Sequence, residues 1–297
     1  MSVLLATLAL NEMEWLPKLV EQHRSWPGLA AWVFVEAADA AYARANPDLV
    51  SNAGLSVDGT TEFLEQLAAE NPLVKHIKYG TSHGFDGAPE KGKCGARQAY
   101  LDVAEQVQPK YVVSIDADEF YTHADQRRLV EVMDAHPDHD AFIFNRREIW
   151  RPPLCASMAL MSYEVIGGFW GIPCCHWWRW RAGMNHRACH NTPSDAEGTP
   201  LNERLLDTRE QQAAGIDMPE MIHFGFAATA RFRLAKNAYY AQRGEVRDPK
   251  RRWYVESRGA WARWHAGKKL PRNAEVVPYA GPVPECFADQ IPVKEQP

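Results

Sequence analysis

Acidic residues follow an apolar run in the stretch YVVSIDADEFY, which spans Tyr111–Tyr121. The apolar and β-branched residues predict a buried strand ending near Ile115, with Asp116 and Asp118 directly after it. Two carboxylates two residues apart on a tight turn can converge on one hard cation, Mg²⁺ or Mn²⁺. A cation held there can bind a nucleotide diphosphate, which bare carboxylates would repel. The alternative is that these acids cap the next helix or are solvated, although the following THAD already has capping-box spacing.

Alternating strand and helix patterns in the first half predict the scaffold for this turn. The predicted strands are Val3–Leu8, Ala31–Val35, Val74–Tyr79, Tyr111–Ile115 and Asp140–Phe144. The predicted helices are Glu12–Arg24, Thr60–Leu67, Gly95–Val107 and Thr122–Met133. Such alternation predicts an α/β fold with a mostly parallel central sheet flanked by helices. Ligands bind at the carboxyl ends of such strands, where we expect both the DAD turn and Glu36 to lie.

Six stretches, in chain order, resemble motifs of the family-2-type glycosyltransferases with the GT-A fold. They are LLATLALNEMEWLPKLVEQH, VFVEAAD, VDGTTEFLEQL, KGKCGARQAYLDVA, SIDADEF and MIHFGFA. The resemblance covers about residues 3–145 and, more weakly, 221–240. It implies a metal-dependent enzyme that moves a sugar from a nucleotide-sugar donor, with UDP the expected nucleotide, to a hydroxyl acceptor.

The resemblance also implies roles for individual side chains. The implied ligands of Mn²⁺ or Mg²⁺ are Asp116, Asp118 and His223, and Asp116 would also face the ribose or base. The residues implied beside the nucleoside and diphosphate are Thr7, Asn11, Glu36, Asp58, Lys93 and Arg97. The chain departs from the family because about twenty residues separate Glu36 from Asp58, and Gln98 replaces the usual Asn. A hydrogen-bonded core residue is the alternative for His223, and a solvated helix edge for Lys93 and Arg97.

The sequence leaves the catalytic base open. An inverting transfer needs a carboxylate near the acceptor hydroxyl, and the candidates are Glu148 in RREIW and Asp195 in TPSDAEG. A surface carboxylate is the alternative for each. The family's acceptor loop often ends in a His-Glu pair, but the comparable position here is His190-Asn191. A retaining transfer would need no such base.

Charge is unevenly distributed along the chain. The net charge is −5, yet residues 229–272 contain thirteen basic and three acidic residues, a net charge of +10, which leaves −15 for the rest. Tyr and Trp side chains are interleaved with these cations. This composition suits an anionic acceptor such as DNA, a phosphorylated lipid or an acidic glycan. A solvated basic helix packed on an acidic catalytic domain is the alternative.

The 297 residues fit a GT-A catalytic domain over 1–226 followed by a C-terminal segment. We expect the nucleotide-sugar half at about 1–145 and loop-rich acceptor-side residues at about 146–226. Residues 227–297 would form a basic, aromatic helical segment and a Pro-rich tail packed on the same domain. The sequence has no apolar run of the ~20 residues that a membrane span needs, and no basic region and cleavage site of a signal peptide. We therefore expect a cytoplasmic protein.

Soft metal ligands and aromatic residues gather in the second half. The possible zinc ligands are Cys174, Cys175, His176, His186, Cys189 and His190. Their spacing lacks the C-x₂-C pair of common zinc sites, so we expect no stoichiometric zinc. The tryptophans of this region are Trp170, Trp177, Trp178 and Trp180. We expect them to line an acceptor cleft or, alternatively, to form a local core.

Other classes of protein share parts of this pattern. A sugar nucleotidyltransferase would have a Gly-rich basic loop after its first strand, but the loop here, TLALNEMEW, has no glycine. A haloacid-type phosphatase would have Thr or Val where Phe120 stands. A nucleic-acid-binding protein with a vestigial nucleotide site would use the basic segment, and the absence of metal-dependent hydrolysis of a nucleotide sugar would distinguish it.

Overall fold

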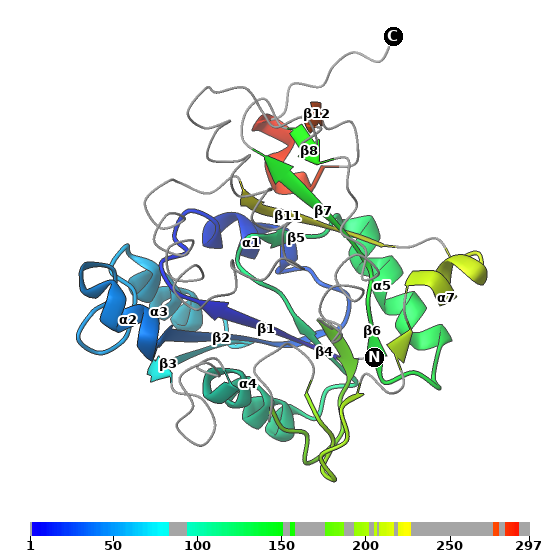
Figure 1. Cartoon of the computed structure of the whole chain (residues 1–297), viewed down its shortest axis with the longest axis horizontal. Helices are drawn as coiled ribbons and strands as arrows, with labels where there is room; N and C mark the ends of the chain where they lie inside the picture. Colours follow the sequence, from blue (N-terminus) through cyan, green and yellow to red (C-terminus); the bar gives the residue numbers. More distant parts are fainter. Residues whose placement is uncertain are drawn as a thin grey trace, which may run out of the picture.

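The fold consists of two β-sheets and the helices that cover them (Figure 1). The computed structural model describes residues 2–82, 94–150, 155–157, 176–186, 193–201, 205–206, 208–216, 219–226, 276–278 and 283–290. Within these ranges no helix has the length and apolar character needed to cross a membrane.

The larger sheet has seven strands. Their spatial order is β10 (Leu205–Leu206), β6 (Ala141–Phe142), β9 (Trp177–Arg179), β4 (Tyr111–Ser114), β1 (Val3–Ala9), β2 (Leu29–Asp39) and β3 (Val74–Ser82). Strands β4, β1, β2 and β3 are parallel, whereas β9 runs antiparallel to both of its neighbours. The predicted α/β class with a mostly parallel central sheet is therefore confirmed.

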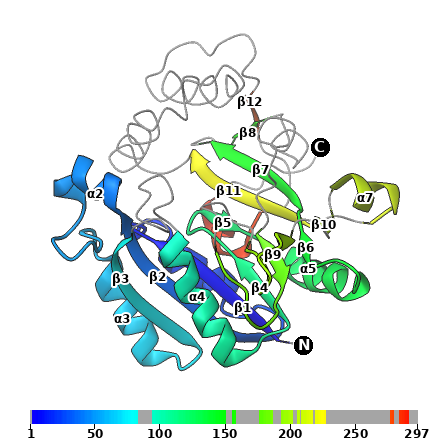
Figure 2. The same ribbon diagram turned by 60° about the horizontal axis from the view of Figure 1, so that its bottom comes forward.

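Helices cover both faces of this sheet (Figure 2). They are α1 (Leu16–His23), α2 (Ala40–Ala45), α3 (Thr60–Glu70), α4 (Cys94–Val107), α5 (His123–Ala135) and α7 (Thr208–Ala213), with 3₁₀ turns η1 (Pro47–Leu49) and η6 (Glu285–Gln290). Apolar side chains of α1, α3 and α5 pack into one core and those of α4 into the core on the opposite face. The predicted capping box begins α5, because the Thr122 hydroxyl accepts a hydrogen bond from the Asp125 N–H at 3.1 Å.

The smaller sheet has five strands, in the order β12 (Val276–Pro278), β8 (Cys155–Ser157), β7 (Asn145–Trp150), β11 (Glu220–Phe226) and β5 (Glu119–Phe120). Strands β7 and β11 are parallel, and β5 runs antiparallel to β11. Only the turn between Ser114 and Glu119 separates β4 from β5. The DAD motif therefore lies where the chain passes from one sheet to the other.

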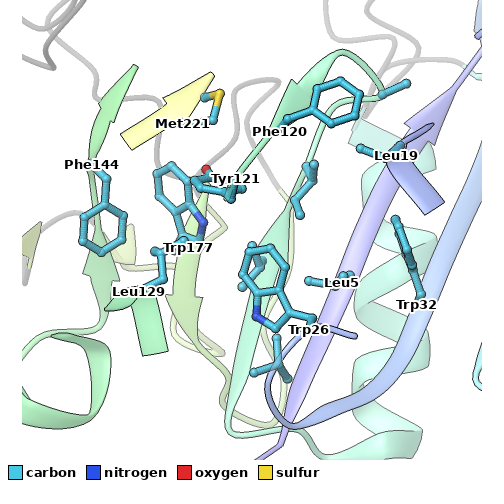
Figure 3. Packing of buried hydrophobic residues seen from close by; sticks show 14 of the residues in the cluster. Leu5, Leu19, Trp26, Trp32, Phe120, Tyr121, Leu129, Phe144, Trp177 and Met221 are labelled. Atoms are coloured by element: carbon cyan, nitrogen blue, oxygen red, sulfur yellow. The ribbon is translucent and has the colours of Figure 1, made fainter. Parts of the chain in front are cut away.

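Strand β9 lies within the residues predicted to be loop-rich, about 146–226, and contributes to the core of the larger sheet. Trp177 and Trp178 are almost fully buried, and their successive positions in a strand point them to opposite faces of the sheet. Trp177 packs into the core shown in Figure 3, while Trp178 packs with the α4 side. For these two residues the core alternative was correct. Trp180 is partly buried against the α4 core, and Trp170 lies outside the described residues.

The C-terminal turn η6 packs against the region of the DAD turn. The Phe287 ring is buried, and its centroid lies 4.9 Å from that of Phe120 and 4.5 Å from that of Phe224. Trp15 completes the cluster, with its centroid 6.4 Å from that of Phe287. The η6 segment thus packs against Phe120 of β5 and Phe224 of β11. The basic segment 229–272 lies outside the described residues, and the division at residue 226 stays a prediction.

Candidate active site

A closed turn carries the DAD motif at the end of β4. The Glu119 N–H donates to the Asp116 carbonyl at 3.0 Å, and the Asp116 N–H donates to Glu119 Oε2 at 2.9 Å. Asp116 is half-buried, Asp118 is 7% exposed and Glu119 is 1% exposed. Asp116 is therefore the most accessible of the three acids, and Glu119, which lies beneath the turn, is the most buried.

His223 of β11 lies beside this turn. Its Nε2 is 3.5 Å from Asp118 Oδ1, and the N–H of Phe224 donates to the Asp118 carbonyl at 2.8 Å. Two adjacent ligands of an octahedral Mg²⁺, each at about 2.1 Å, lie roughly 3 Å apart. The Asp118–His223 pair is close to that spacing and fits a shared cation after a small shift. The structure thus brings together two of the three predicted metal ligands, although no group of three or more His, Cys, Asp or Glu side chains is arranged as a metal site in the part of the chain that the structure describes.

Glu36 does not end its strand, which corrects the sequence-based prediction. After a register shift at Glu36, the backbone of β2 continues to pair with β3 as far as Asp39. The Glu36 side chain is fully buried, with its Oε2 3.0 Å from the Nε2 of His76. Its Oε1 accepts hydrogen bonds at 2.7 Å from the Ser56 N–H and the Thr61 hydroxyl. Burial alone would raise the pKa of Glu36, but these hydrogen bonds outweigh it and hold the pKa at about 2.

Asn11 and Asp58 hold the loop after β1 against the loop before α3. Asn11 has a left-handed backbone (φ 57°), and its Oδ1 accepts the Val57 N–H at 2.9 Å. Asp58 accepts two backbone N–H groups at 3.0 Å, one from Met13 and one from Thr60 in the first turn of α3. Their predicted role beside a nucleoside stays a prediction, and what the structure gives them is the shaping of these two loops.

Thr7 lies in β1, two residues before the strand ends at Ala9. Its side chain is fully buried, and its hydroxyl accepts a hydrogen bond from the Trp32 indole at 3.1 Å. Its predicted role beside the nucleotide stays a prediction.

Arg97 lies beneath the end of β4 on the α4 side. It is 4% exposed, and its Nη1 is 3.3 Å from the Tyr100 hydroxyl and 3.5 Å from Ser114 Oγ. The Tyr100 hydroxyl is also 2.9 Å from Nε2 of His186, whose pKa is lowered by burial and by the charge of Arg97. The solvated-edge alternative is therefore wrong for Arg97. Lys93 lies outside the described residues.

The two candidate bases occupy different places. Glu148 lies in β7, in register with His223 of the neighbouring parallel strand β11. Its backbone therefore lies next to His223, one of the two predicted metal ligands that the structure brings together. Asp195 lies in a turn beyond β9, where its Oδ1 accepts the Thr199 N–H at 2.7 Å and its carbonyl accepts from Asn185 Nδ2 at 2.9 Å. Of the two candidate bases, only Glu148 lies on a strand that neighbours β11.

Sequence reasoning missed the roles of Glu119 and His176. Glu119 was visible as the third acid of DADE, but its burial beneath the turn was not. His176 was grouped with possible zinc ligands, whereas its Nδ1 lies 3.4 Å from Glu119 Oε2. His186 contacts Tyr100 instead, so these two histidines serve different places. The four remaining members of the possible zinc cluster lie outside the described residues.

The comparisons with known proteins give matches among solved structures alone. No protein-family model and no curated protein matches the sequence. S. aureus TarS 1–349 matches with a TM-score of 0.38 and 14% identity, over 60% of this chain and 47% of that chain. The mannosyltransferase PcManGT from Pyrobaculum calidifontis, in complex with GDP-Man and Mn²⁺, matches with a TM-score of 0.33 and 20% identity, over 51% and 36%.

The structure of TarS 1–349 with UDP-GlcNAc matches over 50% of this chain and 35% of that chain, at 14% identity and a TM-score of 0.34. This chain therefore spans less than half the length of the structures it matches. Its own mostly parallel central sheet, flanked by helices, agrees with the predicted α/β fold class.

Proposed function

We propose that this chain is a metal-dependent glycosyltransferase that moves a sugar from a nucleotide-sugar donor to a hydroxyl acceptor. The observation that supports this most directly is the approach of Asp118 and His223 to 3.5 Å at the carboxyl end of β4. The turn between β4 and β5 supplies Asp118 and strand β11 supplies His223, while Asp116 lies two residues away on the same turn. Such an arrangement has no evident use in holding the core together.

The chemistry of the donor set fits a divalent cation shared with phosphate. Mg²⁺ and Mn²⁺ prefer oxygen ligands, and Mg²⁺ is often held by one or two carboxylates plus substrate phosphates. Asp118 and His223, with Asp116 beside them, would hold the cation, and the nucleotide diphosphate would complete its coordination. A cation bound there offsets the negative charge of a departing diphosphate.

Some of the other predicted residues would serve the nucleotide and the acceptor. The loops held by Asn11 and Asp58 follow β1 and precede α3, so they would accommodate the nucleoside, for which we expect uridine. Arg97 would contribute positive charge beneath the end of β4. Glu148 is the favoured candidate for the base that removes the proton of the acceptor hydroxyl, because its strand neighbours β11.

Calorimetric titration of the full chain with UDP, with and without Mn²⁺, tests the proposal. We expect binding that depends on Mn²⁺ in the unmodified protein, and its loss in Asp118→Asn. Asp102→Asn is the matched control, because Asp102 is an exposed aspartate on α4. A bound ligand at 100-fold above its Kd should also stabilise the fold by about 2.7 kcal/mol, measurable as a thermal shift.

Equal, metal-independent binding by both variants would contradict the proposal. Failure of UDP, GDP and their sugar derivatives to bind under any metal condition would also contradict it, and would favour the nucleic-acid-binding alternative. Hydrolysis of a nucleotide sugar in the presence of Mn²⁺, lost in Asp118→Asn, would establish the donor chemistry without knowledge of the acceptor.

A further inference from the structure

A buried pair of ionisable side chains lies directly behind the DAD turn. Glu119 is 1% exposed and His176 is 6% exposed, and they come from distant parts of the chain. Glu119 begins β5, and His176 immediately precedes β9. Neither side chain faces solvent, and the proposed transfer of a sugar assigns neither of them a role.

The Glu119 carboxylate closes the turn from beneath. Its Oε2 accepts the Asp116 N–H at 2.9 Å, while the Glu119 N–H donates to the Asp116 carbonyl at 3.0 Å. Hydrogen bonds from backbone N–H groups to a carboxylate are charge-assisted and stronger than neutral ones. Removing the carboxylate would leave the amide of Asp116 without this acceptor and would loosen the segment between the two aspartates.

His176 joins this carboxylate to the end of β4. Its Nδ1 lies 3.4 Å from Glu119 Oε2 and 3.3 Å from the Ser114 carbonyl, and its own carbonyl accepts the Ser114 N–H at 2.7 Å. Both atoms that face Nδ1 are acceptors, so this nitrogen carries hydrogen. The imidazole thereby contacts both ends of the turn, Ser114 before it and Glu119 after it.

The cost of burying Glu119 indicates that these contacts matter for geometry. An ionised carboxylate out of water is expensive unless it is paired and hydrogen-bonded, and an apolar side chain would suit the core around Phe120 better. The contacts of this carboxylate are instead with the Asp116 N–H on the turn and with His176 beside it. Glu119 is thus placed to hold the turn.

We infer that Glu119 and His176 are positioning residues that fix the DAD turn in the geometry needed to bind the divalent cation. The inference rests on the proposed function, because it concerns the cation of that site. Partners that orient metal ligands typically change metal affinity by about 10- to 100-fold when they are removed. Both residues act through the turn, and neither contacts the cation.

Mn²⁺ binding by the full chain, measured by electron paramagnetic resonance without turnover, tests the inference. Glu119→Gln and His176→Leu should each weaken Mn²⁺ binding at least about 10-fold. His176→Asn should retain affinity within about threefold, because its amide nitrogen can occupy the place of Nδ1 and donate to the same acceptors. His176→Gln should not restore Mn²⁺ affinity, because its amide nitrogen lies at the place of Nε2. If His176→Leu does not fold, the comparison of His176→Asn with His176→Gln tests the inference in its place.

Leu129→Ala is the control for a general loss of stability, because Leu129 is a fully buried residue of α5 outside the turn. A core truncation of this kind should lower the melting temperature and leave Mn²⁺ affinity unchanged. Equal weakening of Mn²⁺ binding in this control, or unchanged Mn²⁺ affinity in both Glu119→Gln and His176→Leu, would overturn the inference but leave the proposed function standing. Absence of Mn²⁺ binding by the unmodified protein would instead overturn the proposed function, and the inference with it.

Discussion

Glu36 and Asp118 both lie near the carboxyl ends of parallel strands, yet their surroundings differ. Asp118 lies in a turn and faces His223, whereas the carboxylate of Glu36 is fully buried among His76, Ser56 and Thr61. The hydrogen bonds to Glu36 anchor the segment that precedes and begins α3. A residue predicted to contact a ligand therefore supports the loop that Asp58 belongs to.

Acid should destabilise the protein through Glu36. Its folded-state pKa of about 2 lies below the ordinary 4.5, so its ionised form stabilises the fold above pH 4.5, and this stabilisation is lost as the pH falls toward 2. The expected loss is on the order of 2 to 3 kcal/mol. Urea unfolding between pH 7 and 2 measures it.

Glu36→Gln should be less stable than the unmodified protein at pH 7 and should depend less on pH between 4.5 and 2. Glu70→Gln, on the exposed end of α3, is the matched control. The same pH slope in Glu36→Gln and in the unmodified protein would show that the hydrogen bonds to Glu36 do not stabilise its charge.

Single residues were predictable from sequence where the chain itself places them. Asp116 and Asp118 follow a β-branched run, so their position at a strand end follows from local pattern alone. The burial of Glu36 depended on Ala37–Asp39 continuing the strand beside β3, which is a long-range pairing. Similarly, nothing in the sequence around His176 indicated that its side chain would contact that of Glu119.

At the scale of elements, prediction succeeded for the units whose periodicity extends over several residues. Strands β1, β3 and β4 and helices α3 to α5 were expected close to their observed bounds, and the capping box identified the start of α5. Strand β2 was expected to end at Val35 but continues to Asp39. Strands β5 and β9 have two and three residues, too few for a pattern, and exist because neighbouring strands supply their hydrogen bonds. The helix expected from Glu12 begins at Leu16, because Asn11 adopts a left-handed backbone and the next residues form a turn.

The 3₁₀ turn η6 should contribute to stability well beyond its length. Phe287 is 4% exposed and packs on Trp15, Phe120 and Phe224. Phe287→Ala should reduce the free energy of unfolding by about 3 to 5 kcal/mol, because it removes a buried ring and leaves a cavity. Urea unfolding followed by tryptophan fluorescence provides the measurement.

Leu73→Ala is the control for this substitution, since Leu73 is 41% exposed and its loss should change stability by less than about 0.5 kcal/mol. A cost for Phe287→Ala no larger than that of the control would indicate that η6 is dispensable for the fold. Phe287 packs on Phe120, which directly follows the DAD turn. We therefore expect the Phe287→Ala variant also to bind Mn²⁺ more weakly than the unmodified protein.

The turn after β4 connects the two sheets of the molecule, and its neighbours come from widely separated parts of the chain. Asp118 belongs to the turn between the sheets and His223 to the smaller sheet, while His176 immediately precedes β9 of the larger sheet. A cation and nucleotide bound at this crossing would link both sheets, so binding should stabilise the whole fold in one transition. The sequence predicted a metal site at this turn, but the meeting of three distant segments there required the folded chain.

Charge at the scale of the whole molecule leads to the last prediction, which concerns the acceptor. Residues 229–272 carry +10 and the remainder −15, and six Tyr and Trp side chains are interleaved with the cations. Cations that neutralise phosphates, together with rings that stack on bases, favour a nucleic-acid acceptor. A base hydroxyl in duplex DNA would have to leave the stack to reach the site. We therefore expect the protein to retard duplex DNA at low salt, with affinity falling steeply as salt rises.

Reversing two adjacent charges in this segment, Arg251→Glu with Arg252→Glu, should weaken DNA binding and reduce the slope of log K against log salt by about 2. The matched control is Arg127→Glu with Arg128→Glu on α5, which changes the net charge equally, outside the basic segment. Equal weakening by both pairs would indicate an effect of net charge alone. Failure of the unmodified protein to retard DNA even at low salt would remove nucleic acid from the acceptors, and the basic segment would then favour a phosphorylated lipid or an acidic glycan.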